Sequence, residues 1–85
     1  MKDIRWDLLK NERLKLTRGA SFEELLGSEL VAIKDHPSKD NQRIMLFKYK
    51  KYIWIVPFVQ ADDHVFLKTL YPSRKYTKIM KEGKL

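Results

Sequence analysis

The apolar positions near the N-terminus of the chain predict a helix. Three leucines form its apolar stripe, namely Leu8, Leu9 and Leu16. Asp7 is placed to cap the first turn, because its carboxylate can accept hydrogen bonds from free backbone amides, and Gly19 is placed to end the helix. Glu12 and Leu14 fall outside the stripe, so the helix is only roughly amphipathic. The pattern places the leucine stripe on the packing side and Leu14 away from it.

Two further helices are predicted from their capping residues. The sequence Ser21-Phe22-Glu23-Glu24 is a capping box, in which the serine and the second glutamate bond each other's backbone amides. The apolar face that follows consists of Phe22, Leu25 and Leu26. Near the C-terminus, Ser73 can cap a short helix that Gly83 ends. Its i, i+3, i+4 stripe consists of Tyr76, Ile79 and Met80.

The middle of the chain is rich in aromatic and β-branched residues and predicts four strands, over residues 30–35, 43–50, 52–59 and 64–71. Lys50-Lys51 forms the tight turn between the second and third of them, although the usual Asn-Gly is absent. Pro57 cannot donate a ladder hydrogen bond, so it marks a bulge or an unpaired side of its strand. The order predicts an α+β fold, with two N-terminal helices, a four-stranded antiparallel sheet and a short C-terminal helix, the helices packing on one face of the sheet.

The length and composition are those of one small domain, which we assign to residues 1–85. The sequence contains no cysteine, which excludes a disulfide framework and a thiolate metal site and fits the reducing cytoplasm. The longest apolar run, residues 53–59, is too short to span a bilayer, and the N-terminal residues lack the apolar segment of a secretory signal. We therefore expect a cytoplasmic protein without membrane contact.

Positive charge is concentrated in the C-terminal part of the chain. The net charge is +7, and residues 1–35 contribute none of it, since seven Lys or Arg there balance seven Asp or Glu. Residues 36–85 hold eleven Lys or Arg against four Asp or Glu. A clustered basic face is typical of proteins that bind nucleic acid, although many small basic proteins use such charge only for solubility.

Two of these cations occupy an unusual position. Arg74 and Lys75 directly follow the predicted cap Ser73, at the positive end of the helix dipole, where each cation costs roughly 0.3–1 kcal/mol. A bound phosphate would reverse that cost, because free amides at a helix start and a guanidinium fork both bind phosphate oxygens. We predict phosphate binding there, with a solvated helix face as the alternative. Further RNA-binding residues are predicted at Lys68, Lys78, Lys81 and Tyr52. Tyr71 is a second tyrosine that could stack on a base, whereas Tyr76 shares the core stripe.

The chain carries few residues for other chemistry. His36 and His64 lie in different loops, and a nuclease that uses a histidine pair would need them to converge, which no pattern requires. The sequence Asp62-Asp63-His64 is typical of a turn rather than of a metal site. The three glycines are isolated, so there is no glycine-rich phosphate loop. We therefore predict no metal and no cofactor.

Two groups of motifs resemble those of a known family. The opening group consists of Trp6-Asp7, Lys10-Asn11 and the segment Arg-Gly-Ala-Ser-Phe-Glu-Glu over residues 18–24, and the closing motif is Pro-Ser-Arg-Lys-Tyr-Thr over residues 72–77. Their order and spacing, with the strands between them, resemble the BrnT family of bacterial toxins over nearly the whole chain. That family often has histidine and arginine where this chain has Arg18 and Thr69.

The resemblance implies a RelE-like fold and an endoribonuclease that inhibits translation by cleaving RNA. Arg74 matches the arginine of the closing motif, and Lys75 matches the basic residue after it. We expect both to stabilise charge on the phosphoryl oxygens, while Tyr71 transfers protons for the RNA's own 2′-hydroxyl nucleophile. The catalytic residues predicted are thus Arg74, Lys75 and Tyr71. A toxin also implies a cognate antitoxin, usually of the ribbon-helix-helix DNA-binding type, through which alone operator DNA would be contacted.

Two other functions stay open at the level of sequence. A nucleic-acid-binding module without catalysis explains the charge and the tyrosines equally well, and RNA of unchanged length after incubation with the protein would favour it. A protein-interaction domain could use the same basic face for an acidic partner, which would exclude RNA from that surface.

Overall fold

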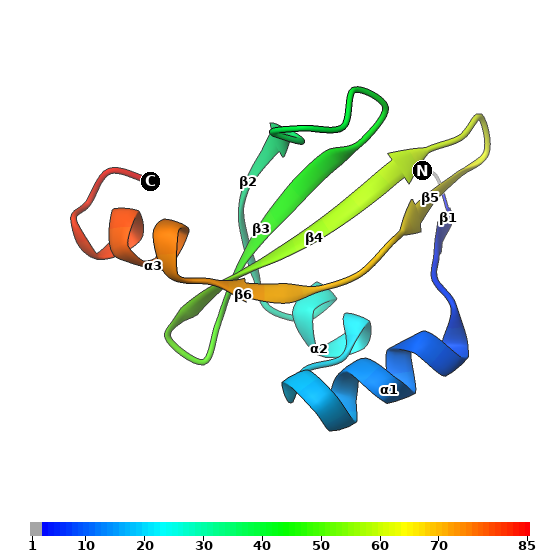
Figure 1. Cartoon of the computed structure of the whole chain (residues 1–85), viewed down its shortest axis with the longest axis horizontal. Coiled ribbons are helices and arrows are strands. Elements are labelled where there is room, and N and C mark those ends of the chain that lie inside the picture. The colour runs from blue at the N-terminus through cyan, green and yellow to red at the C-terminus, as the bar shows by residue number, and fades with distance from the viewer. Residues whose placement is uncertain (1–2) are drawn as a thin grey trace.

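The computed structural model describes residues 3–85 and contains three helices and six strands (Figure 1). In chain order the elements are β1 (Asp3–Arg5), α1 (Leu8–Arg18), α2 (Phe22–Leu26), β2 (Glu29–Asp35), β3 (Arg43–Tyr49), β4 (Tyr52–Gln60), β5 (His64–Leu67), β6 (Tyr71–Ser73) and α3 (Arg74–Lys81). The predicted α+β class and its three helices are confirmed. Within residues 3–85, every helix is too short or too polar to cross a membrane.

The strands form one mixed sheet in the order β1-β5-β4-β3-β2, and β6 pairs with β4 as well. β1 runs parallel to β5, while the other pairs are antiparallel. The prediction of a four-stranded antiparallel sheet is therefore wrong. β1 was missed because its three residues are all exposed and carry no apolar alternation. The predicted strand over residues 64–71 is in fact two strands, β5 and β6.

A bulge opposite Pro57 separates β5 from β6. Phe58 pairs with Leu67 and Ile55 with Tyr71, so residues 56–57 of β4 face three residues, 68–70, of the other chain segment. Pro57 has no N–H to donate, but its carbonyl accepts the N–H of Lys68 at 2.8 Å. The irregularity expected at Pro57 is thus confirmed. An extra residue in a strand redirects the side chains around it, and such bulges are frequent beside functional sites.

The sheet is covered on both faces, because β4 is apolar on both sides. Residues 53–58 of β4 are all buried. Trp54, Val56 and Phe58 pack in one cluster with Phe22 and Leu25 of α2. On the other face, Ile53 and Ile55 pack with Tyr76 and Met80 of α3. The prediction that all helices lie on one face is wrong, since a strand buried on both sides requires a cover on each, which α2 and α3 provide.

The rotation of α1 about its own axis differs from the prediction. Leu14 is 6% exposed, whereas the stripe that was expected to pack is largely open to solvent, with Leu8 at 73%, Leu9 at 72% and Leu16 at 87%. A polar contact explains the difference. The side-chain carbonyl of buried Asn11 accepts the N–H of Phe22 at 2.8 Å, and its amide donates to Glu23 Oε1 at 2.5 Å. This pair of bonds turns Asn11 inward, and Leu14, one turn later, follows it into the core.

The predicted helix caps are confirmed. Asp7 accepts the N–H of Lys10 at 3.1 Å, and α1 ends at Gly19, whose φ of 83° is left-handed. The capping box at the start of α2 is complete. Ser73 caps α3, and the chain leaves that helix through Gly83 at a φ of 74°. Each cap depends on residues within four positions of one another, which is why sequence alone locates it.

Candidate functional site

A cavity of about 320 Å³ opens where the β2–β3 loop, the bulge before β6 and the first turn of α1 meet. Its lining residues are Lys10, His36, Lys39, Gln42, Pro57, Lys68, Thr69 and Tyr71. Three of them are lysines, and no carboxylate of the described chain is among them. A concave surface with charge of one sign concentrates ligands of the opposite sign, so this basic cleft suits a phosphate group.

The strand bulge positions one wall of the basic cleft. Because three residues oppose two at Pro57, Leu67 and Leu70 both point into the core, at 1% and 0% exposure. Lys68 and Thr69, between them, turn toward the cleft instead. Tyr71 then starts β6 and packs partly against the apolar cluster beneath α3. In a strand with unbroken alternation, Leu67 and Leu70 would face opposite sides, because they are three residues apart.

The opposite wall carries a histidine in a fixed orientation. The N–H groups of Ser38 and Lys39 both donate to His36 Nδ1, each at 3.1 Å, and the N–H of His36 itself donates to the carbonyl of Gln42 at 3.1 Å. With Nδ1 accepting two hydrogen bonds, the hydrogen of the neutral ring is assigned to Nε2. His36 can therefore donate a hydrogen bond to a phosphoryl oxygen through Nε2.

The structure brings two of the predicted site residues, Lys68 and Tyr71, into the cleft. Sequence reasoning missed three of its other members, Lys10, His36 and Lys39. No local pattern links these three residues, since they come from α1 and from the loop between β2 and β3. The one sequence signal was the position of Lys10 within the opening motifs.

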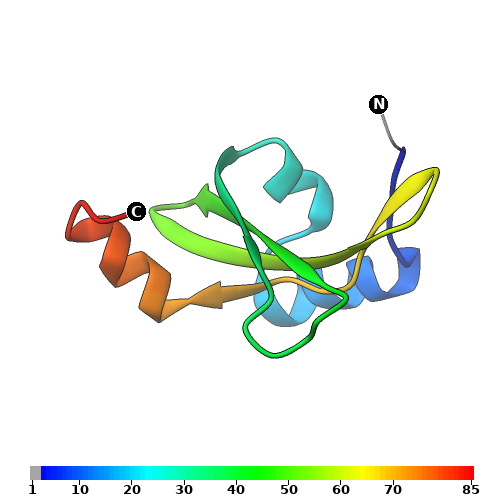
Figure 2. The ribbon, with the colours of Figure 1, turned by 90° about the horizontal axis from the view of Figure 1, so that it is seen from above.

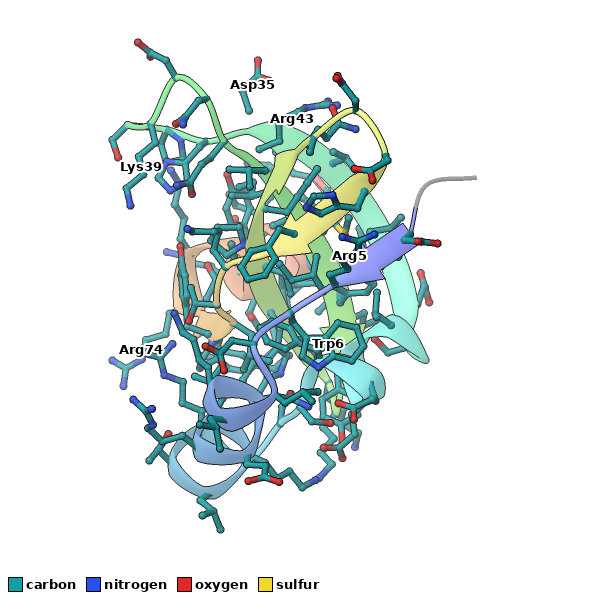
Figure 3. The ribbon with its side chains drawn as sticks, turned by 90° about the vertical axis from the view of Figure 1, so that its right-hand side faces the viewer. Arg5, Trp6, Asp35, Lys39, Arg43 and Arg74 are labelled. Atoms are coloured by element: carbon teal, nitrogen blue, oxygen red, sulfur yellow. The ribbon has the colours of Figure 1, made fainter. Side chains whose placement is uncertain are left out.

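Arg74 lies beside the cleft rather than in it. It is the first residue of α3, directly after β6, and its side chain is exposed. Within residues 3–85 it has no carboxylate partner. Figure 3 shows Arg74 and Lys39 projecting from the same side of the molecule. The guanidinium group of Arg74 is therefore free of any carboxylate within the described residues and open to an anion next to the cleft.

The remaining predicted residues lie elsewhere. Lys75, Lys78 and Lys81 lie on the exposed face of α3 and do not line the cleft. The Nζ of Lys75 is 5.7 Å from the centre of the Tyr76 ring. Tyr52 packs against the cluster beneath α1 and α2, on the face of the sheet opposite Tyr71. The structure therefore does not bring Tyr52 together with Tyr71.

Two long-range contacts fix the strand that carries Tyr71. Thr77 is buried, donates to the Ser73 carbonyl at 2.6 Å and accepts the N–H of Ile53 at 2.9 Å, which locks the start of α3 onto β4. Upstream, Arg18 donates to the carbonyl of Leu70 at 2.5 Å, which ties the end of α1 to the bulge. Both ends of the segment from the bulge to Arg74 are thus held.

The opening motifs have a structural role in this fold. The ring of Trp6 lies 5.6 Å from the ring of Phe22, between centroids, and Asp7 caps α1. Asn11 bonds the backbone at Phe22, as described above, and Ser21 caps α2. These residues hold α1 and α2 together, and α1 in turn delivers Lys10 to the cleft.

A wider depression of about 600 Å³ lies between α1 and α2, and most of its charged groups already bond neighbouring polar groups. Glu24 bonds Lys15, the backbone N–H of Ser21 and the hydroxyl of Tyr49. The bonds from Lys15 and Tyr49 lower the pKa of Glu24 to about 2 and raise the pKa of each donor. This network stabilises the packing of α1, α2 and β3 and leaves the basic cleft as the candidate functional site.

The second histidine is bound outside the cleft. His64 Nδ1 lies 2.8 Å from Asp63 Oδ1, and this contact lowers the pKa of the aspartate. Arg5 approaches the same aspartate at 3.9 Å. Among residues 3–85, no group of three His, Cys, Asp or Glu side chains is arranged to hold a metal.

The mixed sheet with α1 and α2 on one face and α3 on the other defines a small α+β domain with the fold of a ribonuclease toxin. A solved structure that shares this fold is the Brucella abortus ribonuclease toxin BrnT, with a TM-score of 0.57 and 16% sequence identity, over 86% of this chain and 97% of that chain. At this identity the similarity establishes the fold, and the resemblance drawn from the motifs is confirmed at that level. No protein-family model matches the chain, and no curated protein matches its sequence.

Proposed function

We propose that this chain is the toxin of a bacterial toxin–antitoxin pair and acts as a metal-independent endoribonuclease that inhibits translation. The observation that carries the proposal is the basic cleft, which combines Tyr71 and His36 with three lysines and is lined by no carboxylate of the described chain. Its occurrence on the fold of a ribonuclease toxin gives the class of reaction.

The reaction proposed for the cleft uses the nucleophile that RNA carries. The 2′-oxygen attacks the adjacent phosphorus, the bond from phosphorus to the 5′-oxygen breaks, and the proton lost by the 2′-hydroxyl is balanced by the proton that the 5′-oxygen gains. The products are a 2′,3′-cyclic phosphate and a 5′-hydroxyl. The enzyme then needs in-line positioning and donors for the charge that develops on the phosphoryl oxygens.

The residues divide these tasks by position. Lys10, Lys39 and Lys68 neutralise the phosphate in the cleft, and His36 donates a hydrogen bond to it through Nε2. We assign proton transfer to Tyr71, the hydroxyl-bearing ring in the cleft. Arg74 holds the neighbouring phosphate, so the catalytic role predicted for Arg74 and Lys75 becomes one of substrate positioning.

The test is digestion of single-stranded RNA by the purified chain in EDTA. Tyr71→Phe removes only a hydroxyl, and we expect its cleavage rate to fall roughly 100-fold or more, as for the loss of a general acid–base group. Tyr76→Phe is the matched control, because Tyr76 packs in the core beneath α3, and it should cut as the wild type does. Arg74→Ala should raise KM more than it lowers kcat.

Three outcomes would contradict this assignment. Undiminished cleavage by Tyr71→Phe would remove Tyr71 from the reaction. Products without a cyclic phosphate end would exclude attack by the 2′-hydroxyl. RNA that binds but keeps its full length with the wild-type chain would favour the non-catalytic binding module.

The proposed partner is an antitoxin that neutralises the cleft. An acidic segment of the antitoxin would be complementary to the three lysines of the cleft. The exposed leucines of α1, two of which directly precede Lys10, offer an apolar surface for the same partner. We propose a ribbon-helix-helix DNA-binding end for this antitoxin, so that the toxin contacts operator DNA only through it, in the cytoplasm. A gene with no short DNA-binding protein encoded beside it would count against this partner.

A further inference from the structure

The turn between β3 and β4 has a strained backbone. Lys50 and Lys51 form a two-residue loop between the paired residues Tyr49 and Tyr52, with φ angles of 52° and 65°. Among residues 3–85, the other positive φ angles belong to glycines. A loop of this kind requires positive φ at both positions, which Asn-Gly adopts readily and lysine does not. Folding alone therefore does not explain two lysines here.

The two lysines belong to a larger basic surface at one end of the molecule. Ile53, just after the turn, pairs with Ser73, just before α3, so the turn and α3 are held close together. Figures 1 and 2 both show them at the same end. We define the turn–α3 surface by its six cations, Lys50, Lys51, Arg74, Lys75, Lys78 and Lys81.

Within the part of the chain that the structure describes, the cations of the turn–α3 surface have no carboxylate partner. Arg5, Lys15 and Arg43, elsewhere in the structure, all lie against carboxylates. Within residues 3–85, none of the six cations does so, and Lys50 and Lys75 instead lie 5.3 and 5.7 Å from the centres of tyrosine rings. Two acids lie near this surface, Glu82 at the end of α3 and Glu24, which accepts a hydrogen bond from the hydroxyl of Tyr49 at 2.6 Å. Unpaired like charges repel one another, so this arrangement also costs stability unless an anion binds.

We propose that the turn–α3 surface is a second binding site for the RNA backbone, which holds the strand several nucleotides away from the basic cleft. The identity of the polyanion as RNA rests on the proposed function. From Tyr71 in the cleft, β6 extends about 10 Å to Arg74, and α3 extends about 12 Å farther. A strand that leaves the cleft past Arg74 is thus led onto the lysines of α3 and the turn.

Lysines on an open surface bind phosphates without reading bases. This site therefore predicts dependence on RNA length and on salt rather than on sequence. It also predicts that replacing the two lysines with a sequence that favours the turn would stabilise the fold but weaken RNA binding, because two phosphate contacts would be lost. These two effects have opposite signs, which a purely structural role of the turn would not produce.

The test is the double variant Lys50→Asn/Lys51→Gly, measured by thermal unfolding and by binding to a 20-nucleotide single-stranded 2′-O-methyl RNA. The methyl group blocks the 2′-nucleophile, so binding is measured without cleavage. We expect the Tm to rise by about 4–8 °C as strain is relieved. We expect the slope of log affinity against log salt to shrink by about 1.4, which is a loss of affinity of about tenfold at 0.15 M salt. Binding of a 4-nucleotide RNA should not change.

Two further variants test whether the loss of affinity comes from the charge of the turn itself. The first distinguishes it from relief of backbone strain, and the second from a lower net charge of the protein. Lys50→Gln/Lys51→Gln removes the charge and keeps the strain, so it should lose the same affinity with a smaller rise in Tm, which comes from reduced charge repulsion alone. Arg13→Gln/Lys34→Gln also removes two cations, from exposed positions outside the cleft and the turn–α3 surface, and should bind the 20-nucleotide RNA nearly as the wild type does.

The inference is overturned if the turn variants bind the long RNA as the wild type does, if the control loses as much affinity, or if Asn-Gly fails to raise the Tm. Binding to anionic lipid vesicles in place of RNA would also overturn it. Because the probe cannot be cleaved, the binding experiment tests the second RNA-binding site independently of the proposed nuclease activity. A wild-type chain that binds RNA through the turn but never cuts RNA disproves only the nuclease, whereas cleavage with turn-independent binding disproves only the second site.

Discussion

Thr77 provides a sharp test of how the closing motif stabilises the fold. Its hydroxyl donates to the Ser73 carbonyl and accepts the N–H of Ile53, and both Thr77 and Ile53 are buried, at 4% and 0% exposure. Thr77→Val keeps the shape of the side chain and removes both bonds. The substitution therefore measures what the hydroxyl contributes, with little change in packing.

The magnitude follows from the fate of the Ile53 amide. An amide left buried without a partner costs roughly 1–3 kcal/mol, and the lost bond to the Ser73 carbonyl costs about 1 kcal/mol more. The extra buried methyl group returns about 0.8 kcal/mol. We expect Thr77→Val to lower the free energy of unfolding by about 1–3 kcal/mol and the Tm by at least about 4 °C.

The assay is urea unfolding followed by tryptophan fluorescence, with hydrogen exchange at the Ile53 amide as a local readout. Thr17→Val is the matched control. Thr17 makes the same bond to the carbonyl four residues earlier, at 2.8 Å to Arg13, but it is exposed and no amide depends on it. Its change should stay within about 0.5 kcal/mol. Equal effects of the two substitutions, or an Ile53 amide that exchanges as slowly in Thr77→Val as in the wild type, would refute the reasoning.

Two further predictions concern stability. Leu14→Ala should cost roughly 2–5 kcal/mol, whereas Leu16→Ala should change stability by less than about 0.5 kcal/mol, and a reversed order in chemical unfolding would contradict the observed rotation of α1. The pKa of Glu24 is lowered from 4.5 to about 2, so the stabilisation from its bonds is complete above pH 4.5 and is lost as the pH falls toward 2. Tyr49→Phe removes one of those bonds, so the loss of stability between pH 4.5 and 2 should be smaller than in the wild type. If the free energy of unfolding falls equally over this pH range in both proteins, the bond between Tyr49 and Glu24 is excluded.

The candidate site could be predicted only in part. Lys68 and Tyr71 were found because they lie in the basic C-terminal segment, next to the closing motif. Lys10 and His36 were not found as site residues, because they come from separate elements that meet only when the sheet has formed. Tyr52 lies on the face of the sheet opposite Tyr71, because a strand residue's face depends on the pairing register, which the turn and the core together set.

The sequence by itself determined the features whose causes are local. The capping residues Asp7, Ser21 and Ser73 and the interruption at Pro57 each follow from hydrogen-bonding groups and backbone preferences within a few residues. Clustered positive charge was equally visible, since counting it requires no fold.

Only the tertiary structure decided which residues meet. The addition of β1 beside β5, the burial of β4 on both faces and the inward turn of α1 at Asn11 all depend on contacts between segments far apart in the chain. The basic cleft is the product of these contacts, because one extra residue at the bulge opposite Pro57 redirects Lys68 and Thr69 toward His36 and Lys10. Local propensities cannot specify such a meeting, since its energy comes from burial and pairing that exist only once the chain has folded.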